Sequence, residues 1–485
     1  MKFFDRKTEL KVLRETFEAC CEGKMNFAVI YGRRGVGKTR LVHEAFSLSG
    51  VRFLYIFVGR KSLDIQLGKF LDRLSECLGR RVPRVRSFED FLLLLRDISK
   101  KDAIIVVFDE FQNFKDVDES IFSIMQEFVD DMKFRENVKL FIIVIGSLVG
   151  MMHNIFEAKE APLYGRATLK IHLRPFRYWQ IRNMLMSYDR FNEEEIVEIY
   201  SMLGGMPRYY DTIDRLGLKI RKETIIDYFT NKSYAGWREV RDELIEEFKD
   251  AHPTYFSILE AISMGKNDSG EIINYTGIPS KSIHKYLNEL INHFEILKKA
   301  LPYGAKPRAR GAKYFIIDPF YRFWFRYIFP NIDLIEIEHT KPLKKHIMDD
   351  LPNHIGPIFE EIARETILAA SGSEVDDIKI PKINKIGPWW DNKGNEIDIV
   401  AGWGQKVVLI GEVSWSKKQY NVNDINELEN KIRQMGAKNV SIIIISRGGT
   451  TRGARSYIEE KGGYILGIDD LAKIWDQLTQ TNKDI

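Results

Sequence analysis

The chain has 485 residues, of which 44% are hydrophobic and 29% are charged. Such a composition is typical of a folded protein with about three domains of roughly 150 residues, and it excludes a disordered, collagen-like or low-complexity chain. Its 73 Lys and Arg residues against 69 Asp and Glu residues give a net charge of +4, which neither requires nor excludes a nucleic-acid partner.

Cysteine content and hydropathy indicate the cellular compartment in which the protein is expected. Three cysteines, none of them in a CxxC pair, are too few for a disulfide framework. The longest uncharged apolar run, 140–152, is shorter than the about 20 residues of a membrane span. We therefore expect a soluble cytoplasmic protein without a membrane partner.

Strand and helix patterns alternate over residues 1–175, which indicates an α/β fold with right-handed crossovers. Amphipathic stretches separate five mostly continuous apolar runs, and such runs are typical of a parallel sheet buried on both faces. The predicted strands are 27–31, 51–58, 104–108, 141–145 and 168–173.

The rest of the chain changes character twice. Residues 176–250 are predicted to be helical, and 251–340 to contain short helices followed by a hairpin of strands 295–299 and 313–317. A polar stretch and then Pro352, Gly356 and Pro357 indicate a boundary before a second α/β domain at 355–475. Its predicted elements are a helix at 358–370 and strands at 396–401, 407–413, 440–445 and 464–467.

A phosphate-binding motif follows the first predicted strand. Glycines in such a loop let backbone N–H groups point at phosphate oxygens, and the helix N-terminus that follows adds positive potential. We predict that Lys38 contacts the β- and γ-phosphates of ATP and that Thr39 binds Mg²⁺. The motif G-x-x-x-x-G-K-[ST] consists of Gly32, Arg33, Arg34, Gly35, Val36, Gly37, Lys38 and Thr39.

Polar residues at the ends of later strands complete a hydrolytic site. Strand 104–108 ends in Asp109 and Glu110, a Walker B arrangement in which Asp109 would bind Mg²⁺ and Glu110 would act as general base. Ser147 follows strand 141–145 and is a candidate sensor of the γ-phosphate or the water. Arg166 is a candidate arginine finger or phosphate sensor, and a surface arginine is the alternative.

These elements resemble the archaeal ATPase family of P-loop NTPases, which is close to the AAA+ and STAND groups. The resemblance covers nearly the whole chain. It implies that Arg6 and Glu9 lie over the nucleotide, with Asp5 in place of the family's small residue, and that Pro207 contacts the adenine. The segments that carry it are Phe4-Asp5-Arg6-Lys7-Thr8-Glu9-Leu10, Leu173-x-Pro175-Phe176, Gly204-Gly205-Met206-Pro207-Arg208-Tyr209 and Asp318-Pro319-Phe320-Tyr321-Arg322-Phe323-Trp324-Phe325.

Residues 272–294 are predicted to form a helix-turn-helix, and the hairpin that follows would be the wing of a winged helix. The polar face of the second helix includes Lys281 and Lys285, while Arg308, Arg310 and Lys313 lie at the wing tip. These cations could bind double-stranded DNA through its phosphates. The alternative is a winged helix that serves only as a protein contact or lid.

The last domain carries acids on adjacent strands that a turn at 402–405 joins. This pairing would bring Asp398 and Glu412 together, where they could share a divalent metal. The domain resembles the PD-(D/E)xK nuclease-like domain, which implies that Asp398 and Glu412 are metal ligands and Glu361 the helix acid. Ser414 stands where the family has its catalytic lysine; Lys431 is a candidate substitute and Lys417 a weaker one. The alternative is a degenerate domain that binds nucleic acid without cutting it.

The sequence therefore predicts a Mg²⁺-dependent ATPase with a P-loop core (1–175), a helical lid (176–250), a winged helix (251–340) and a restriction-endonuclease-like α/β domain (355–475). Its ligands would be ATP and Mg²⁺, with duplex DNA and a second copy of the chain as candidate partners. Two alternatives remain: a slow-turnover ATP-gated regulator or scaffold, and an active ATP-regulated DNA nuclease.

Overall fold

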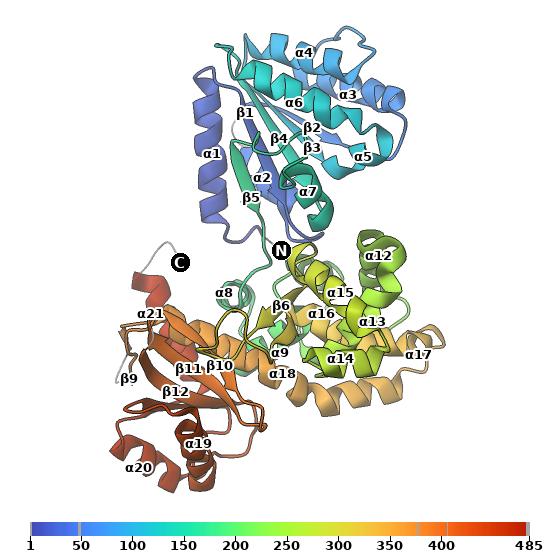
Figure 1. Ribbon diagram of the computed structural model, residues 1–485. Coiled ribbons are helices and arrows are strands. Elements are labelled where there is room, and N and C mark those ends of the chain that lie inside the picture. Colours follow the sequence, from blue (N-terminus) through green and yellow to red (C-terminus); the bar gives the residue numbers. More distant parts are fainter. Residues whose placement is uncertain (1, 47–49, 376–377, 405, 482–485) are drawn as a thin grey trace. The chain divides into compact units, whose positions relative to one another are not determined.

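The computed structural model describes residues 2–46, 50–375, 378–404 and 406–481 (Figure 1). The chain folds into two compact units. The first contains Met1–Pro175 and Met206–Thr212, and the second contains Phe176–Gly205 and Ile213–Ile485. Among the described residues, no helix is long and apolar enough to cross a membrane.

A five-stranded parallel sheet with the order β2-β3-β4-β1-β5 is the centre of the first unit, which confirms the predicted parallel sheet. Neighbouring strands pair in register, as Val29 with Val144 and Val106 with Ile142 show. The strands are β1 (Asn26–Tyr31), β2 (Arg52–Phe57), β3 (Ile104–Asp109), β4 (Leu140–Gly146) and β5 (Leu169–His172).

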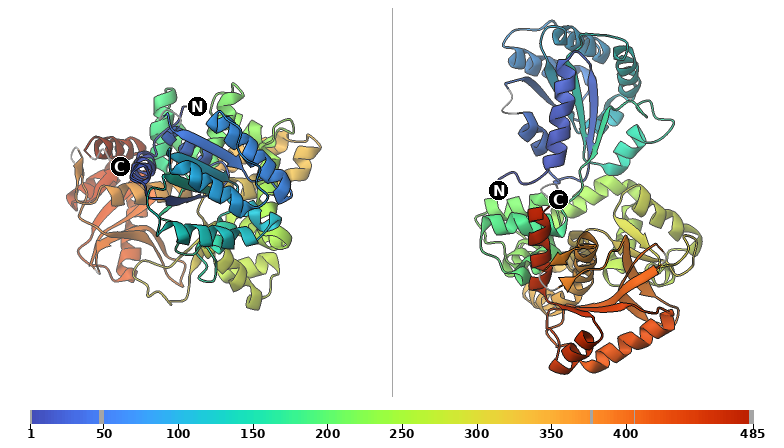
Figure 2. Two further views of the ribbon diagram at one scale, coloured as in Figure 1. Left: turned by 90° about the horizontal axis from the view of Figure 1, so that it is seen from above. Right: turned by 90° about the vertical axis from the view of Figure 1, so that its left-hand side faces the viewer.

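Helices cover both faces of this sheet, so its central strands are apolar on both sides (Figure 1 and Figure 2). Alternate residues of β3 and β4, such as Val106 and Ile142, belong to a core shared with α3, α4 and α6. On the opposite face, Phe46 of α2 contacts Phe141. The helices are α1 (Lys7–Cys21), α2 (Lys38–Phe46), α3 (Leu63–Leu78), α4 (Phe88–Ser99), α5 (Phe114–Val117), α6 (Ser120–Met132) and α7 (Val149–Phe156), with a 3₁₀ turn at Phe111–Asn113.

The second unit begins with helices, as predicted for 176–250. Helix α10 starts in the segment that belongs to the first unit and ends in the second. These helices are α8 (Tyr178–Tyr188), α9 (Glu193–Leu203), α10 (Pro207–Arg215), α11 (Lys222–Thr230), α12 (Gly236–Phe248), α13 (His252–Ser263), α14 (Ser269–Thr276), α15 (Ser280–Asn292), α16 (Pro319–Phe323), α17 (Ile332–Glu336) and α18 (Lys341–Ala369).

Between α15 and α16, strands β6 (Leu297–Ala300) and β7 (Lys313–Ile316) pair antiparallel and form a hairpin, which we call the basic hairpin (297–316). Short 3₁₀ and π segments connect the neighbouring helices. They are Lys249–Ala251, Trp324–Ile328 and Phe329–Asn331.

A second five-stranded sheet, with the order β10-β11-β12-β13-β14, carries the C-terminal part of the second unit. Its first two pairs are antiparallel and its last two are parallel. Side chains of α19 and α20 form a core with one face, and α18 and α21 pack together through Trp475 and Thr366. The elements are β8 (Glu374–Val375), β9 (Ile378–Lys379), β10 (Lys385–Trp390), β11 (Glu396–Trp403), β12 (Lys406–Ser414), α19 (Val422–Met435), β13 (Ser441–Ser446), α20 (Arg452–Glu460), β14 (Tyr464–Leu466) and α21 (Ile468–Thr481).

The predicted boundary near Pro352 and Pro357 is wrong, because both prolines lie inside the continuous helix α18. A proline inside a helix removes one backbone hydrogen bond and costs about 3 kcal/mol. Packing offsets this cost: Leu351, Ile355 and other side chains on one face of α18 are buried. The polar stretch at 341–350 is the start of this helix.

Candidate functional site

The P-loop connects β1 to α2 as the sequence predicts. Gly32, Gly35 and Gly37 all have positive φ, at 153°, 84° and 101°, a conformation that glycine adopts without strain. At Gly32 a Cβ atom would lie 2.2 Å from the carbonyl oxygen of Leu173. The loop therefore needs glycine there, both for its curvature and for its approach to the chain after β5.

The amine of Lys38 lies within the curve of this loop. Its Nζ donates to the carbonyl oxygens of Gly32, at 2.7 Å, and Arg33, at 3.0 Å. The residue is 6% exposed. The lysine charge is therefore held at the concave face of the loop, where backbone N–H groups can bind phosphate.

Two oxygen ligands meet where α2 begins and β3 ends. The Thr39 hydroxyl donates to Asp109 Oδ2 over 2.8 Å, and the Glu110 backbone N–H donates to Asp109 Oδ1 over 2.9 Å. Hydroxyl and carboxylate oxygens are the ligands that Mg²⁺ prefers, so these two residues fit the predicted metal. The Tyr55 hydroxyl also donates to Asp109, and burial followed by this hydrogen bond raises the pKa of Tyr55. The sequence analysis missed Tyr55 because nothing in β2 distinguishes it from a core aromatic.

A second polar cluster surrounds Glu110. Ser147, at the end of β4, donates to Glu110 Oε2 over 2.6 Å, and Gln112 donates to the same oxygen. Glu110 has φ 56° and ψ 43°, a left-handed conformation that costs a non-glycine residue about 1–3 kcal/mol. The adjacent ends of β3 and β4 thus bring the predicted base and the predicted sensor into contact. Gln112 was not foreseen, because a glutamine after an acidic pair has no distinctive spacing.

Residues far apart in the sequence close this end of the sheet. The Arg6 guanidinium donates to the carbonyl oxygen of Arg174 over 2.7 Å and pairs with Glu9 at 3.3 Å. Arg6 is 7% exposed, and burial lowers its pKa. Arg6, in the N-terminal segment Phe4–Leu10, is therefore fixed beside the segment that follows β5.

The segment Met206–Thr212 also contacts the P-loop. Pro207 is the first residue of α10, and the Arg208 side chain packs so closely over Gly35 that a Cβ atom there would lie 2.7 Å from Arg208 Cδ. Both residues belong to the first unit. Arg208 is thus a further candidate for contact with phosphate. The sequence analysis quoted it inside the motif without giving it a role.

Arg166 is not part of this cluster, and its assignment as a phosphate sensor in its own chain is wrong. It precedes β5, whereas the P-loop follows the opposite end of the parallel strand β1. Its guanidinium pairs with Asp130 at 3.2 Å and donates to the Tyr164 carbonyl oxygen at 2.8 Å. A finger that acts on a second copy of the chain stays a prediction.

In the C-terminal sheet, β11 and β12 bring Asp398 and Glu412 together as predicted. Asp398 Oδ2 accepts from the Val413 backbone N–H over 2.9 Å. Burial first, and the charge of Asp398 second, raise the pKa of Glu412. Lys431 of α19 donates to Glu412 Oε1 over 2.8 Å, so the candidate substitute lysine contacts the carboxylate pair directly. The predicted turn at 402–405 includes Gln405, which lies outside the described residues.

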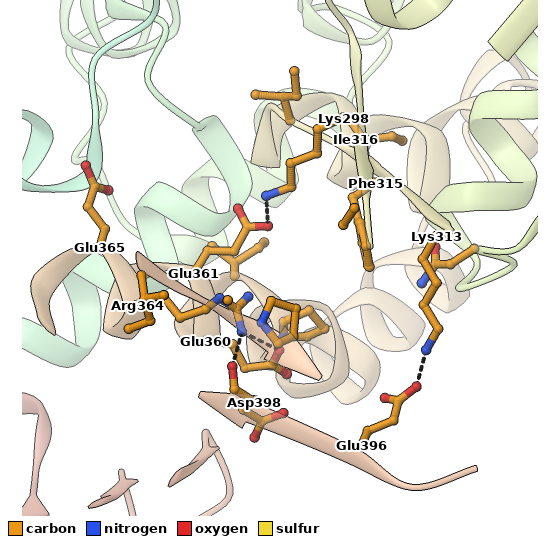
Figure 3. A pocket seen from close by; sticks show the side chains of 18 of the residues that line it. Lys298, Lys313, Phe315, Ile316, Glu360, Glu361, Arg364, Glu365, Glu396 and Asp398 are labelled. Atoms are coloured by element: carbon orange, nitrogen blue, oxygen red, sulfur yellow. Dashed lines mark hydrogen bonds and ion pairs between the residues drawn. The ribbon is translucent and has the colours of Figure 1, made fainter. Parts of the chain in front are cut away.

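The helix acid beside this pair is Glu360, which corrects the assignment of Glu361. Arg364 donates to Glu360 Oε2 at 3.4 Å and to the Asp398 carbonyl oxygen at 2.9 Å, whereas Glu361 pairs with Lys298 (Figure 3). Burial and then the charge of Asp398 raise the pKa of Glu360. Within the described ranges, no cluster of three or more His, Cys, Asp or Glu side chains has the geometry of a metal site.

The predicted DNA-contacting cations fall into two groups. Lys281 and Lys285 on α15, and Arg308 and Arg310 in the basic hairpin, are exposed. Lys313 is different, because its amine pairs with Glu396 and lies 4.9 Å from the Trp390 ring centroid.

Two described protein families and a protein from Methanocaldococcus jannaschii match this chain. Residues 3–213 match a family described as an ATPase domain predominantly from Archaea, and residues 324–427 match a family of archaeal and bacterial proteins of unknown function. The chain is 30% identical over 420 residues to the uncharacterized protein MJECL04 of Methanocaldococcus jannaschii, a match that spans 85% of this chain and 87% of that protein.

Two solved structures match the chain. The Walker-type ATPase PABY2304 of Pyrococcus abyssi matches with a TM-score of 0.50 and 21% identity, over 67% of this chain and 96% of that one. The ORC2 protein of Aeropyrum pernix, in ADPNP–ADP complexes, matches with a TM-score of 0.44 and 15% identity, over 72% and 96% of the two chains.

The fold and the P-loop define a Walker-type ATPase domain. The chain belongs to the same family as the Methanocaldococcus jannaschii protein MJECL04, and its residues 3–213 match an ATPase domain found predominantly in Archaea.

Proposed function

We propose that this protein binds and hydrolyses ATP with Mg²⁺ at the site formed by the P-loop and the ends of β3 and β4. The observation that carries the proposal is the 2.8 Å contact between Thr39 and Asp109, residues 70 positions apart. A hydroxyl from the P-loop helix and a carboxylate from β3 are the pair needed to hold the metal between loop and strand.

In this mechanism the P-loop backbone and Lys38 hold the phosphates. The lysine exchanges its bonds to the loop carbonyls for bonds to phosphate oxygens, so its charge is positioned before ATP binds. Thr39 and Asp109 would hold Mg²⁺, and the bound ion would supply positive charge to the phosphate oxygens.

Glu110 accepts a proton from the attacking water, because it is the carboxylate next to Asp109 that is not bonded to Thr39. Hydrogen bonds from Ser147 and Gln112 fix Glu110 Oε2 and leave Oε1 to orient the water. Steady-state ATP turnover, measured with and without DNA, tests the proposal. Tight ATP binding with negligible turnover under both conditions would favour a nucleotide-gated regulator or scaffold instead.

We propose that residues 251–340 of the second unit act as a winged-helix, DNA-binding module coupled to this ATPase. The support is local: a helix pair, α14 and α15, is followed by an antiparallel hairpin with exposed Arg308 and Arg310. These cations suit the phosphates of duplex DNA.

Replacing Arg308 and Arg310 with alanine is expected to weaken duplex DNA binding at every sequence. Loss of two phosphate contacts should reduce the slope of log K against log salt by about 2. Adding Lys313→Ala should change the slope little further, because Glu396 already pairs with that amine. Fluorescence anisotropy across salt concentrations is the measurement. Lys24→Ala with Lys101→Ala, two exposed cations of the other unit, is the control; an unchanged slope in the hairpin variant would show that the hairpin serves protein contacts.

A second candidate function is cleavage of DNA by the nuclease-like C-terminal domain. The contact between Lys431 and Glu412 favours it, because that lysine can supply the positive charge absent at Ser414. Glu412 and Asp398 supply two carboxylates for a divalent metal, while Lys431 competes with the metal for Glu412. We therefore propose weak metal binding and slow cleavage or none.

Supercoiled plasmid nicking by the wild type, Asp398→Ala and Lys431→Ala tests this domain in Mg²⁺ and Mn²⁺. The expected result is nicking near background in all three proteins. Rapid nicking that both substitutions abolish would establish an active nuclease and contradict the slow-cleavage expectation. Rapid nicking that both variants retain would assign the cleavage to a different source.

A further inference from the structure

The second unit contains a cavity of about 600 Å³, seen from close by in Figure 3. Its walls come from the basic hairpin, the short helix α16, the C-terminal half of α18, and strands β10 and β11. Small-molecule sites in proteins typically have volumes of about 300–1,000 Å³. A space of this size accommodates a single nucleotide but not a double helix.

Hydrogen bonds fix the basic hairpin against β10, so the hairpin forms a well-defined wall of the cavity. The Tyr303 backbone N–H donates to the Pro388 carbonyl oxygen over 2.9 Å, and Trp390 Nε1 donates to the Gly311 carbonyl oxygen over 2.9 Å. Tyr303 is also part of the core formed with α19 and the sheet.

Charged side chains of both signs line the cavity, and most of them neutralise one another. Four acids have a basic partner: Glu361 with Lys298, Glu396 with Lys313, Glu360 with Arg364 at 3.4 Å, and Glu365 with Arg177 at 3.3 Å. The remaining lining acid is Asp398, and the remaining lining cation is Arg322.

Asp398 and Arg322 differ in whether their polar atoms have hydrogen-bond partners. Asp398 accepts a hydrogen bond from the Val413 backbone N–H and shares another with the carboxyl group of Glu412. Arg322 Nε is buried without a hydrogen-bond partner, and its guanidinium forms no ion pair within the described part of the chain. Burial lowers the pKa of Arg322, while the charges of Glu361 and Glu360 act in the opposite direction.

Arg322 is partly buried and its Nε lacks an acceptor, which is unfavourable unless oxygen acceptors reach the other nitrogens of its guanidinium. The cavity gives such acceptors access to Arg322, and phosphate oxygens match the planar, multi-donor geometry of arginine. Trp389 and Phe315 line the same space and are half-buried. Aromatic faces in a site with a phosphate-binding cation are typical of nucleotide recognition, since every base can stack on them.

We propose that this cavity binds one phosphate-bearing nucleotide, with its phosphate on Arg322 and its base against Trp389 and Phe315. The nucleotide is either free or the unpaired end of a strand. The site is separate from the P-loop, which lies in the other unit.

Binding to the full-length Lys38→Ala variant tests the proposal, because that change removes the phosphate-binding lysine of the P-loop. Titration calorimetry with deoxyadenosine monophosphate, adenosine and inorganic phosphate is the measurement. The monophosphate should bind more tightly than adenosine or phosphate alone. Adding Arg322→Gln should weaken it about 10- to 100-fold, as expected for loss of a charge-assisted hydrogen bond.

Three further variants separate binding from folding. Arg322→Lys should retain part of the affinity because it keeps the charge, and Trp389→Leu should weaken the monophosphate more than inorganic phosphate. Arg84→Gln, an exposed arginine of the other unit, is the matched control and should bind as the parent does. The thermal midpoint of each variant, and ATP binding by the same substitutions made with Lys38 retained, report whether the variants are folded.

Short single strands with and without a 5′-phosphate distinguish the two sources of the ligand. Tighter binding of the phosphorylated strand than of the monophosphate indicates a strand end, and binding of the monophosphate alone indicates a free nucleotide. The proposal is overturned if neither probe binds the Lys38→Ala variant, or if Arg322→Gln and Trp389→Leu both leave the affinity unchanged. Binding of inorganic phosphate as tight as that of the nucleotide would also overturn it.

Discussion

Lys38→Ala is expected to abolish ATP binding at the P-loop. The Lys38 amine lies inside the loop and bonds to two of its carbonyl oxygens, so in the ATP complex it is poised to contact the phosphates directly. Each charge-assisted hydrogen bond contributes about 1.5–3 kcal/mol. Loss of two such bonds weakens binding by roughly 10²- to 10⁴-fold, which isothermal titration calorimetry with Mg²⁺-ATP detects directly.

Lys24→Ala is the matched control, since this exposed lysine lies in the same unit outside the loop. Its affinity for ATP should equal that of the wild type. An unchanged affinity in folded Lys38→Ala would contradict the assignment of the P-loop as the ATP site.

Glu110→Gln is expected to preserve ATP binding and to abolish hydrolysis. The substitution keeps the size and the hydrogen-bonding ability of the side chain but removes the group that accepts the proton of water. General-base catalysis typically contributes 10²- to 10⁴-fold, so the turnover rate should fall by about that factor. Single-turnover phosphate release and an equilibrium binding measurement separate the two effects.

Ser147→Ala gives a graded comparison. It removes one hydrogen bond to Glu110 Oε2 and leaves the bond from Gln112. Turnover should fall, but less than in Glu110→Gln. If Glu110→Gln lost ATP binding while its fold stayed intact, Glu110 would have to be reassigned from general base to nucleotide binding.

Sequence patterns predict the ATPase core well because short-range rules determine it. Five apolar runs become the five strands, since strands buried on both faces need continuous apolar sequence. The P-loop and the Asp109–Glu110 pair have fixed spacings relative to their strands. The parallel sheet then places the end of β3 beside the P-loop without further information.

Elements that depend on tertiary packing were not predictable. Strand β10 contains Gly387 and Pro388, which favour a loop by local preference, yet it pairs with β11 around a bulge. The choice between Glu360 and Glu361 depends on the rotation of α18, which neighbouring residues do not specify. Arg166 looked like a sensor because its distance from the P-loop depends on strand direction and register.

The long helix α18 has a mechanical consequence. Its 29 residues extend about 43 Å at 1.5 Å per residue. In its first turn Lys344 pairs with Asp227 of α11, in its middle His354 contacts the Ser201 carbonyl oxygen, and in its C-terminal half Glu360 lies beside Asp398. Because a helix resists stretching, a displacement of α11 would be carried along the axis of α18 toward Glu360 and Asp398.

Two prolines, Pro352 and Pro357, interrupt the backbone hydrogen bonds of α18. Pro352 and Pro357 cannot donate to the carbonyl groups four residues earlier, at Met348 and Asn353, and those are the points where a helix bends most easily. Bending is therefore concentrated within about two turns, on either side of the buried His354. Helix α18 is therefore stiff toward both ends and bends most easily between Met348 and Pro357. The amount of bending in this segment would determine how much of a displacement at one end reaches the other.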